Sequence, residues 1–476
     1  MIKTMKEIPV TEQSCPFSTA KDYCHMDEQG YVEKEYLFTG TSNVYHTAEN
    51  GQVEIEYADV PYTNNLIVRC PADPEKFSGH VVVEITNATA KWNIERMWII
   101  SQRYFMRHGI AYIGITSKPD VFDSLKRYDE SRYGSLDWPN PRPEAERVLP
   151  DPESDRLTFL LGDQECGLFW DMLSDLADLL RRDVDLNPLR AYRPKYVSLT
   201  GWSQSSCYLT RYVNTFAYRN READRPVYDG YLAAGGVYML GIPVNQNEYD
   251  RPENMLDCFI HHMEQPLVIV QTMSEDGSFG NDRVPRFNSE EPGNLCRLVE
   301  IAGATHDTKQ TIVDYYAGDE KMLKGTCLAT YLGEHPYPND FPYDYPINAA
   351  YDHLFRWVET GEAPAVVPRM EWTAAGVPAT DAFGNAVGGV RTAFVDLPTC
   401  RYVPWSIENG RKNVLFGHVE LFSPELLQEL YGSLSAYEKR VREVTAKHVA
   451  KGYVLKEEEE LLVEEAVKLA RERGLQ

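Results

Sequence analysis

The stretch that decides the fold is Lys195-Tyr-Val-Ser-Leu-Thr-Gly-Trp-Ser-Gln-Ser-Ser-Cys-Tyr-Leu-Thr-Arg-Tyr212. It begins as a short apolar strand, passes through Gly201-Trp-Ser203-Gln-Ser205 and continues with helical spacing. A serine at the apex of a strand, turn and helix is held in a strained backbone conformation, with its hydroxyl clear of the sheet and close to a helix N-terminus. The pattern predicts a nucleophile elbow of the form G-x-S-x-S.

Two glycine positions of the usual elbow pattern differ in what they hold here. Gly201 is present, and we expect it to be required because a Cβ at this position would collide with the neighbouring strand. Ser205 is a small residue in place of the usual second glycine. A Gly/Ser-rich loop that binds nothing is the alternative interpretation of these five residues, so the rest of the chain has to decide between the two.

The composition is that of a globular protein with a large core. The chain has 476 residues, of which 43% are hydrophobic and 25% charged. This length suggests about three domains, although α/β folds with insertions often form one larger unit. Nine cysteines are scattered without C-x-x-C spacing, so the sequence predicts neither a disulfide framework nor a zinc site. We therefore expect no metal and no other cofactor.

The net charge indicates the class of partner, and the start of the chain indicates the location. A formal net charge of −24 would repel nucleic acid and anionic membrane surfaces, because both attract Lys and Arg. The first ten residues lack the apolar run of a signal peptide, and no later stretch is long enough for a membrane span. The sequence predicts a cytoplasmic protein whose partner is a small molecule.

The first part of the chain predicts strands and then a β-α-β rhythm. Residues 31–46 and 53–70 alternate with period two, interrupted by Gly, Asn and Pro, as in opening antiparallel strands. Residues 80–87 and 111–116 are nearly continuous apolar runs, as in strands buried on both faces, with a helix expected over 92–108 between them.

The later part continues the same alternation with two insertions. Residues 118–160 predict a long irregular excursion, and residues 237–264 lie where a lid would be inserted. Further expected strands and helices are a helix over 167–182, strands over 227–236, 266–272 and 296–302, a closing helix over 347–360, and two charged helices over 424–474.

Three side chains follow successive predicted strands in the order serine, acid, histidine. Ser203 ends one strand, Glu275 and Asp276 follow a later one, and His306 follows the next. In a doubly wound sheet the carboxyl ends of the strands meet at one edge, and this chain order is that of α/β-hydrolases. We therefore expect Ser203 as nucleophile, His306 as general base and Glu275 as the orienting acid, with Asp276 as the alternative acid.

Other residues are alternatives for the general base or are expected to complete the site. His261 and His262, in the predicted lid, are the alternative bases, and Asp307 is expected to cap the loop of its neighbour. The backbone N–H of Gln204 is the first expected oxyanion donor, and the turn at Asn87-Ala88 is expected to supply the second. The aromatic residues, among them Trp138 and Trp202, suggest a bulky or aromatic substrate.

Several motifs together resemble the bacterial alpha/beta hydrolase domain-containing proteins over nearly the whole chain. They are Gly201-x-Ser203-Gln-Ser205, Val82-Val-Glu-Ile-Thr-Asn87, Arg132-Tyr133, Val270-Gln-Thr272, Ala302-Gly-x-x-His306, Gly388-Gly-Val-Arg-Thr392 and Pro404-Trp405. The resemblance implies an α/β-hydrolase fold and an esterase-like serine mechanism. The chain departs from similar members at Ser206, where Gly is frequent, and at Met273, where a carboxylate is common.

These observations predict an α/β-hydrolase fold with a mostly parallel central sheet flanked by helices, a lid insertion and a C-terminal extension that ends in helices. We expect a core over 1–365, with the lid over 237–264, and an extension over 366–476 packed on it. The predicted function is a serine hydrolase that cleaves a carboxylic ester or lactone through an acyl-enzyme. The alternatives are an acyltransferase or C–C hydrolase with the same triad, or a non-catalytic ligand-binding relative in which Met273 marks a decayed acid site. A homodimer interface is an alternative role for the lid and the extension.

Overall fold

The computed structural model describes residues 1–17, 23–148, 163–219, 225–236, 240–248, 260–275, 284–316, 337–408 and 410–476. The chain forms two compact units. The first unit comprises Met1–Leu267 and Pro292–Asn294, and the second comprises Val268–Glu291 and Leu295–Gln476. The predicted division into a core over 1–365 and an extension over 366–476 stays a prediction.

The first unit is built on a twisted sheet with the strand order β1-β2-β3-β5-β4-β6-β7. Its strands are β1 (Ile2–Ile8), β2 (Tyr31–Thr47), β3 (Val53–Pro71), β4 (His80–Ile85), β5 (Ala111–Ile115), β6 (Tyr196–Trp202) and β7 (Gly230–Ala234). The strands β5, β4, β6 and β7 run parallel to one another. The strands β1, β2 and β3 add an antiparallel part beside β5. The predicted β-α-β core with opening antiparallel strands is confirmed.

The antiparallel part is longer than the sequence predicts. The expected interruptions in β2 and β3 are wrong, because both strands run through their Gly, Asn and Pro residues with only local bulges near Ser42 and Val44. At Gly40 a Cβ would lie 2.6 Å from the Tyr62 hydroxyl, so the glycine allows close pairing instead of breaking the strand. The edge strand β1 was missed because most of its side chains are exposed and show no regular alternation.

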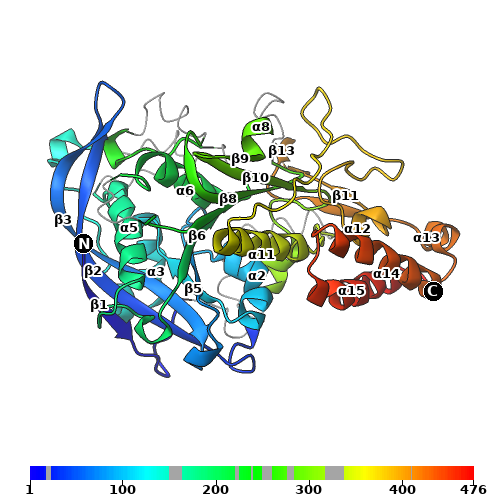
Figure 1. The fold of residues 1–476 in the computed structure, drawn as a ribbon, viewed down its shortest axis with the longest axis horizontal. Helices are drawn as coiled ribbons and strands as arrows, with labels where there is room; N and C mark the ends of the chain where they lie inside the picture. The colour runs from blue at the N-terminus through cyan, green and yellow to red at the C-terminus, as the bar shows by residue number, and fades with distance from the viewer. Residues whose placement is uncertain are drawn as a thin grey trace. The chain divides into compact units, whose positions relative to one another are not determined.

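Three helices of the first unit cover the sheet and hold its parallel part. They are α2 (Arg96–Arg107), α5 (Phe169–Leu180) and α6 (Gln204–Thr215). As Figure 1 shows, α5 runs beside β1 and β2, while α6 follows β6. Every residue of β4 and β5 is buried, which is typical of strands covered on both faces.

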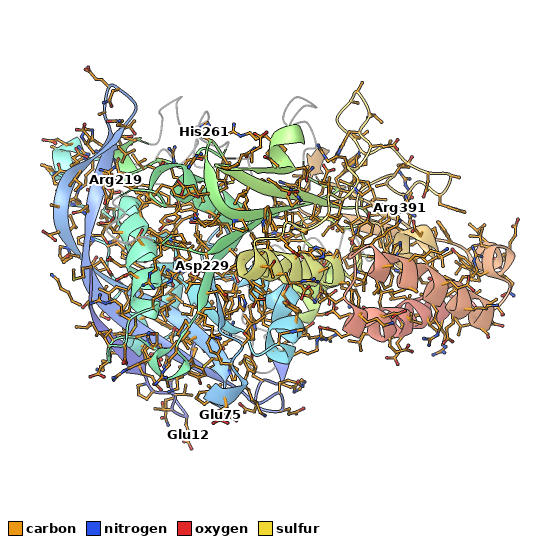
Figure 2. All side chains as sticks on the ribbon, viewed as in Figure 1. Glu12, Glu75, Arg219, Asp229, His261 and Arg391 are labelled. Atoms are coloured by element: carbon orange, nitrogen blue, oxygen red, sulfur yellow. The ribbon has the colours of Figure 1, made fainter. Side chains whose placement is uncertain are left out.

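Two polar contacts fix these elements in the first unit. Glu84 in β4 accepts hydrogen bonds from the backbone N–H groups of Met97 (2.9 Å) and Trp98 (3.1 Å) at the start of α2. Asp229, which Figure 2 labels, accepts from Arg181 at 2.6 Å and from the backbone N–H of Val197 at 2.7 Å. The first contact fixes α2 on the sheet, and the second fixes the end of α5 beside β6.

The predicted excursion over 118–160 is more regular than expected. It contains α3 (Phe122–Tyr128) and α4 (Glu130–Tyr133). The buried carboxylate of Glu35 in β2 forms an ion pair with Arg132 and accepts from the Tyr133 hydroxyl at 2.9 Å, so α4 is anchored on the antiparallel strands. Residues 149–162 lie outside the described residues, as do 237–239 and 249–259 of the predicted lid.

Short 3₁₀ helices connect several of these elements. They span Pro74–Lys76, Pro119–Val121, Glu144–Glu146, Cys166–Leu168, Arg190–Tyr192, Gln246–Glu248 and Lys456–Glu458. A short π-helical turn covers Gln310–Asp314.

The second unit contains a long helix and three strands that lie wholly or partly within it. Strand β10 lies between β8 and β9 and is hydrogen-bonded to both. The elements are β8 (Met263–Thr272), α8 (Val284–Phe287), β9 (Ser289–Glu291), β10 (Asn294–Ile301) and α11 (Asp344–Thr360). The guanidinium of Arg297 in β10 lies 5.4 Å from the ring centroid of Trp357 in α11, so the predicted closing helix packs against this strand.

The end of the chain consists of small hairpins and helices. These elements are α12 (Ala393–Asp396), β11 (Cys400–Val403), β12 (Ser406–Glu408), β13 (Arg411–Asn413), β14 (His418–Leu421), α13 (Pro424–Tyr431), α14 (Leu434–Ala450) and α15 (Glu459–Glu472). The strand β11 pairs with β14 and β12 pairs with β13, both antiparallel. In Figure 1 the helices α14 and α15 lie side by side.

Two predicted helices over 424–474 are in fact three. Gly432 ends α13 in a left-handed conformation with φ 75°, and the Ser433 side chain then caps α14 by accepting from the backbone N–H of Ala436 at 3.2 Å. Asp396 fixes α14 by pairing with His448 at 3.0 Å, and it also accepts from Arg391, labelled in Figure 2, at 2.7 Å.

Candidate active site

Ser203 lies at the turn between β6 and α6 with a backbone conformation that L-residues rarely adopt. Its φ is 61° and its ψ is −126°. Such a conformation costs about 1–3 kcal/mol and persists only where the surrounding structure enforces it. The backbone N–H of Ser203 donates to the carbonyl oxygen of Ala234 in β7 at 2.8 Å. The predicted strand, sharp turn and helix are confirmed, and Ser203 occupies the apex.

Two glycines allow the backbone to turn this sharply. A Cβ at Gly201 would lie 2.6 Å from the carbonyl oxygen of Ser205. The expected collision with the neighbouring strand is therefore wrong in its partner, because Gly201 faces the first turn of α6. Gly235, with φ 67°, follows β7, and a Cβ there would lie 2.4 Å from the Trp202 ring. Gly201 therefore leaves room for the first turn of α6, and Gly235 leaves room for the Trp202 ring.

Hydrogen bonds to two carbonyl groups secure the elbow. The Ser206 hydroxyl donates to the carbonyl oxygen of Ser203 at 2.6 Å, and the Ser206 N–H donates to the same oxygen at 2.9 Å. The side-chain amide of Asn87, just after β4, donates to the carbonyl oxygen of Trp202 at 3.1 Å. Ser206 therefore gives the turn a buried hydrogen bond.

The turn after β4 contains the two residues expected to supply an oxyanion donor. The N–H and carbonyl groups of Asn87 both bond to Ile94, at 2.9 Å each, so its N–H has an acceptor already. The carbonyl of Ala88 accepts from the backbone N–H of Lys91 at 2.9 Å, and Lys91 has φ 64°. Ala88 is completely buried. Of these two residues, Ala88 is the better candidate for an N–H donor.

Gln204 begins α6, and the first N–H groups of a helix have no acceptor within the helix. This is the position from which a backbone N–H supports an oxyanion in the elbow pattern. The Gln204 side chain is 2% exposed and accepts a hydrogen bond from the ammonium group of Lys118. The geometry of Gln204 is thus compatible with the predicted donor, and it adds a buried lysine to the same place.

Lys118 was not predicted. It follows β5, whose carboxyl end lies at the same edge as those of the parallel strands β4 and β6. Burial lowers the pKa of the Lys118 ammonium to about 8. The available signal is a lysine three residues after a buried strand, at the start of the predicted irregular segment.

The second unit brings Glu275 and His306 together. The His306 Nδ1 and the Glu275 Oε1 are 2.8 Å apart, and the two side chains are 6% and 4% exposed. A carboxylate can only accept, so Nδ1 carries the proton and the other ring nitrogen, Nε2, is left as an acceptor in the neutral ring. The other carboxylate oxygen, Oε2, accepts from the backbone N–H of Thr272. Asp276, the alternative acid, lies outside the described residues.

Backbone contacts join the loops that carry these two residues. The N–H of His306 donates to the Ser274 hydroxyl at 2.8 Å, and the N–H of Met273 donates to the carbonyl of Ala304 at 3.1 Å. The loop after β8 and the loop after β10 therefore form one hydrogen-bonded pair. Met273 is 2% exposed, so its side chain packs in the interior.

Segments from the last part of the chain hold the histidine loop on both sides. Before it, the N–H of Ala302 donates to the carbonyl of Val390 at 3.1 Å, and after it, the N–H of Asp307 donates to the carbonyl of Leu415 at 2.9 Å. A Cβ on Gly417 would lie 2.2 Å from the Thr305 side chain, so the glycine permits this close approach. The sequence did not predict these supports, because the partners are more than 80 positions apart along the chain.

The remaining predicted residues are placed as follows. Trp138 is completely buried, stacked on Phe169 with ring centroids 5.9 Å apart. The Trp202 ring is 1% exposed. Both are interior side chains of the first unit, and their contact with a substrate stays a prediction.

The alternative histidines lie before β8, at its amino end. The His262 Nε2 is 3.0 Å from Glu264 Oε1, and the His262 side chain is 53% exposed. His261, labelled in Figure 2, is also exposed. Since elbow chemistry is arranged at the carboxyl ends of strands, this placement favours His306.

Among the residues that the structure describes, no group of three or more His, Cys, Asp or Glu side chains is arranged to hold a metal ion. The same part of the chain contains no helix long and apolar enough to cross a membrane.

Comparison with known proteins assigns the chain to a family. A family model described as an alpha/beta hydrolase domain matches residues 4–464. The chain belongs to this alpha/beta hydrolase family. The match covers both the elbow and the Glu275–His306 pair. A comparison with curated protein sequences finds no match.

A comparison with solved structures finds matches at low identity and low TM-score. The siderophore hydrolase EstA from Aspergillus nidulans is 14% identical, with a TM-score of 0.28 over 54% of this chain and 73% of that chain. Esterase 2 from Thermogutta terrifontis, phosphoramylated by tabun, is 15% identical, with a TM-score of 0.32 over 62% and 94%. Est1E from Butyrivibrio proteoclasticus is 13% identical, with a TM-score of 0.28 over 60% and 99%. The family assignment rests on the family model.

Proposed function

We propose that this alpha/beta hydrolase is a serine hydrolase that cleaves a carboxylic ester or lactone through an acyl-enzyme. The observation that carries the proposal is the left-handed backbone of Ser203 at the β6–α6 turn, with φ 61° and ψ −126°. A serine is rarely held in this conformation, and strain of this kind is concentrated at functional sites. Membership of the family and the buried Glu275–His306 pair support it.

In the proposed acylation step, His306 Nε2 takes the proton from the Ser203 hydroxyl while Oγ attacks the ester carbonyl carbon. The carbonyl π electrons move to its oxygen, which the N–H groups of Gln204 and Ala88 stabilise as an oxyanion. Collapse of this tetrahedral intermediate breaks the bond to the alkoxy group, and His306 gives it the proton. The products are an alcohol and an acyl ester on Ser203.

In the proposed deacylation step, water attacks the acyl carbon and gives a proton to His306 Nε2. The second tetrahedral intermediate expels Ser203 Oγ, which takes that proton back, and the carboxylic acid is released. A lactone follows the same two steps, but its alcohol and acid stay in one molecule. Neither step requires a metal or an electron carrier.

Glu275 is proposed as the orienting acid. Its Oε1 lies 2.8 Å from His306 Nδ1, so it fixes the tautomer in which Nε2 accepts a proton. The negative charge also stabilises the imidazolium that forms during each step. Oε2 is engaged by the Thr272 N–H, which holds the carboxylate in one orientation.

A non-catalytic ligand-binding protein, in which Met273 marks a decayed acid site, is the alternative. Glu275 supports the enzyme instead, because a carboxylate two residues later pairs with His306. An acyltransferase or C–C hydrolase uses the same groups, so the acceptor and the scissile bond have to be found by experiment.

A substrate screen tests the proposal. Aryl esters, alkyl esters and lactones are offered to the wild-type protein, with Ser203→Ala as the blank. Ser205→Ala, which removes a buried hydroxyl two positions further on, is the matched control. We expect turnover of at least one ester or lactone by the wild-type and Ser205→Ala proteins and none above background by Ser203→Ala. Undiminished turnover by Ser203→Ala would contradict the proposal.

A further inference from the structure

Lys118 is buried beside the turn that carries the proposed nucleophile. The three parallel strands β5, β4 and β6 end at one edge of the sheet. The side-chain amide of Asn87, after β4, donates to the carbonyl of Trp202 at the end of β6 at 3.1 Å. The Ser117 hydroxyl donates to the carbonyl of Thr86 at 2.6 Å, which connects the loop after β5 to the loop after β4. The next residue, Lys118, is 1% exposed and reaches α6.

Two contacts of the Lys118 ammonium are with the first part of α6. Its Nζ donates to the side-chain oxygen of Gln204, the residue after Ser203. It also lies 4.9 Å from the ring centroid of Tyr208, one helical turn further along. Both partners are in the helix whose first N–H is the proposed oxyanion donor.

Burying an ammonium group only to fill space is unfavourable in free energy. Removing a cation from water is unfavourable unless the interior supplies compensating groups. A methionine or leucine would fill the same volume without that penalty. The lysine therefore has a role that needs its charge, its hydrogen bonds or both.

We propose that Lys118 is a positioning residue for the oxyanion site. It holds the Gln204 side chain in place, and it adds a positive charge beside the Gln204 N–H that donates to the developing oxyanion. This inference rests on the proposed serine hydrolase function. A fixed charge near the site where an anion develops stabilises the transition state more than the neutral substrate. Its loss should therefore lower kcat more than it changes KM.

The charge on Lys118 depends on pH, so its expected effect on kcat depends on pH as well. Burial lowers the pKa of Lys118 to about 8, while the nearby Asp120 carboxylate favours the charged form. The ammonium is thus mostly charged at neutral pH, and the charge is lost as the pH rises through about 8. Titratable groups that act on it come from three elements: Asp120 in the 3₁₀ helix 119–121, Cys166 in the 3₁₀ helix 166–168, and Cys207 in α6. Burial raises the pKa of the Cys166 thiol well above its usual value, so this neighbour stays neutral in the same range.

The test compares Lys118→Met and Lys118→Arg with Lys126→Met, which removes a partly exposed lysine of α3. The substrate is whichever ester the screen finds, and kcat and KM are measured from pH 6 to pH 10. For Lys118→Met we expect kcat to fall about 10- to 100-fold, with KM changed less than about threefold. Lys126→Met should behave as wild type.

The pH profile separates positioning by charge from simple packing. The wild-type kcat should decline above pH about 8, because the neutral lysine no longer supports the oxyanion. Lys118→Arg should restore activity and remove this decline, since a guanidinium stays charged across the whole range. Lys118→Met should show no decline, because it has no charge to lose.

A second variant covers the case in which Lys118→Met does not fold, as judged by its melting temperature. Gln204→Ala keeps the ammonium and the oxyanion N–H but removes their connection, and we expect kcat to fall about tenfold. Unchanged kcat in Lys118→Met, or in Gln204→Ala where the first does not fold, would overturn the inference. A raised KM with unchanged kcat would also overturn it, because that result assigns Lys118 to ground-state binding.

Failure of this inference can be told apart from failure of the proposed function. A fluorophosphonate probe labels an active-site serine independently of the natural substrate. Labelling of Ser203 in the wild-type protein together with wild-type kinetics in Lys118→Met rejects only the role of Lys118. Absence of labelling at Ser203 rejects the serine hydrolase itself.

Discussion

Hydrogen bonds hold both the elbow and the histidine loop, but only the elbow contains a residue with a strained backbone. In the elbow, Ser203 has a strained backbone with φ 61°, enforced by neighbours such as Ala234, whose carbonyl oxygen accepts from the Ser203 N–H. In the histidine loop, the His306 ring and backbone are both hydrogen-bonded, to Glu275 at 2.8 Å and to Ser274 at 2.8 Å. The elbow therefore carries backbone strain at its central residue, whereas in the histidine loop the hydrogen bonds of His306 are made without such strain.

This difference decides how each region should respond to mutation. Removing a strained residue relieves an unfavourable conformation, so activity and stability change in opposite directions. Removing one member of a buried, hydrogen-bonded pair leaves its partner without compensation, so activity and stability fall together. The comparison therefore predicts which variants lose function while keeping or gaining stability.

The largest expected effect is at Ser203. We expect Ser203→Gly to lower kcat by a factor of about 10⁴ or more, because no nucleophile remains. The same change should raise the free energy of unfolding by about 1 kcal/mol, since glycine adopts this backbone without strain. Ester hydrolysis and denaturant unfolding measure the two effects. A Ser203→Gly protein less stable than wild type would refute the strain argument.

Next in size is the loss of the orienting acid. Glu275→Gln should lower kcat by about 10³- to 10⁴-fold, because an amide no longer fixes the His306 tautomer or stabilises the imidazolium. Asp276→Asn is the matched control and should change kcat less than about threefold if Glu275 is the acid. Kinetics on the two purified variants decide the assignment. The reverse ranking would move the role to Asp276.

Gly417 tests the support of the histidine loop. Gly417→Ala places a Cβ 2.2 Å from the Thr305 side chain and 2.3 Å from the carbonyl oxygen of Val403. We expect kcat to fall about tenfold and unfolding to become easier by about 2 kcal/mol, as for other overpacked sites. Thermal melting and steady-state kinetics measure both.

Gly410→Ala is the control for this variant. Gly410 has φ 73°, and nothing lies within 4 Å of its added Cβ, so only the backbone conformation is penalised. We expect it to cost about 1 kcal/mol of stability and to leave kcat unchanged. Equal kinetics for the two alanine variants would show that the segment around Leu415 does not position His306.

The smallest expected effect is at Ser206. Ser206→Ala removes the hydroxyl that donates to the Ser203 carbonyl at 2.6 Å, while the backbone N–H keeps its bond to the same oxygen. We expect a loss of about 1 kcal/mol in stability and a change in kcat below about threefold. A much larger fall in kcat would mean that this one bond enforces the strained turn.

The elbow was predictable because its determinants are local. Gly201, Ser203 and the apolar strand before them lie within a few positions, and steric limits on the backbone act over that range. Even so, the sequence did not show that Gly201 faces Ser205, because the direction of a missing Cβ depends on how the following helix turns. The buried parallel strands were also predictable, because each is a continuous apolar run.

Features that depend on distant contacts were not predictable. Lys118 looks like a surface residue in the sequence, and only its contact with Gln204 shows that it is buried. The support of the histidine loop by Val390 and Leu415 joins segments with no shared pattern. The edge strand β1 has mostly exposed side chains, so its pairing with β2 gives no periodic signal.

The central claim is that Ser203 is the nucleophile activated by His306, and covalent labelling followed by peptide mass spectrometry tests it most directly. The wild-type protein is treated with a fluorophosphonate, and the labelled peptide is identified beside Ser203→Ala and His306→Ala. We predict one adduct, on Ser203, absent from Ser203→Ala and formed about 10³-fold more slowly in His306→Ala. An adduct on another residue, or undiminished labelling in either variant, would contradict the claim.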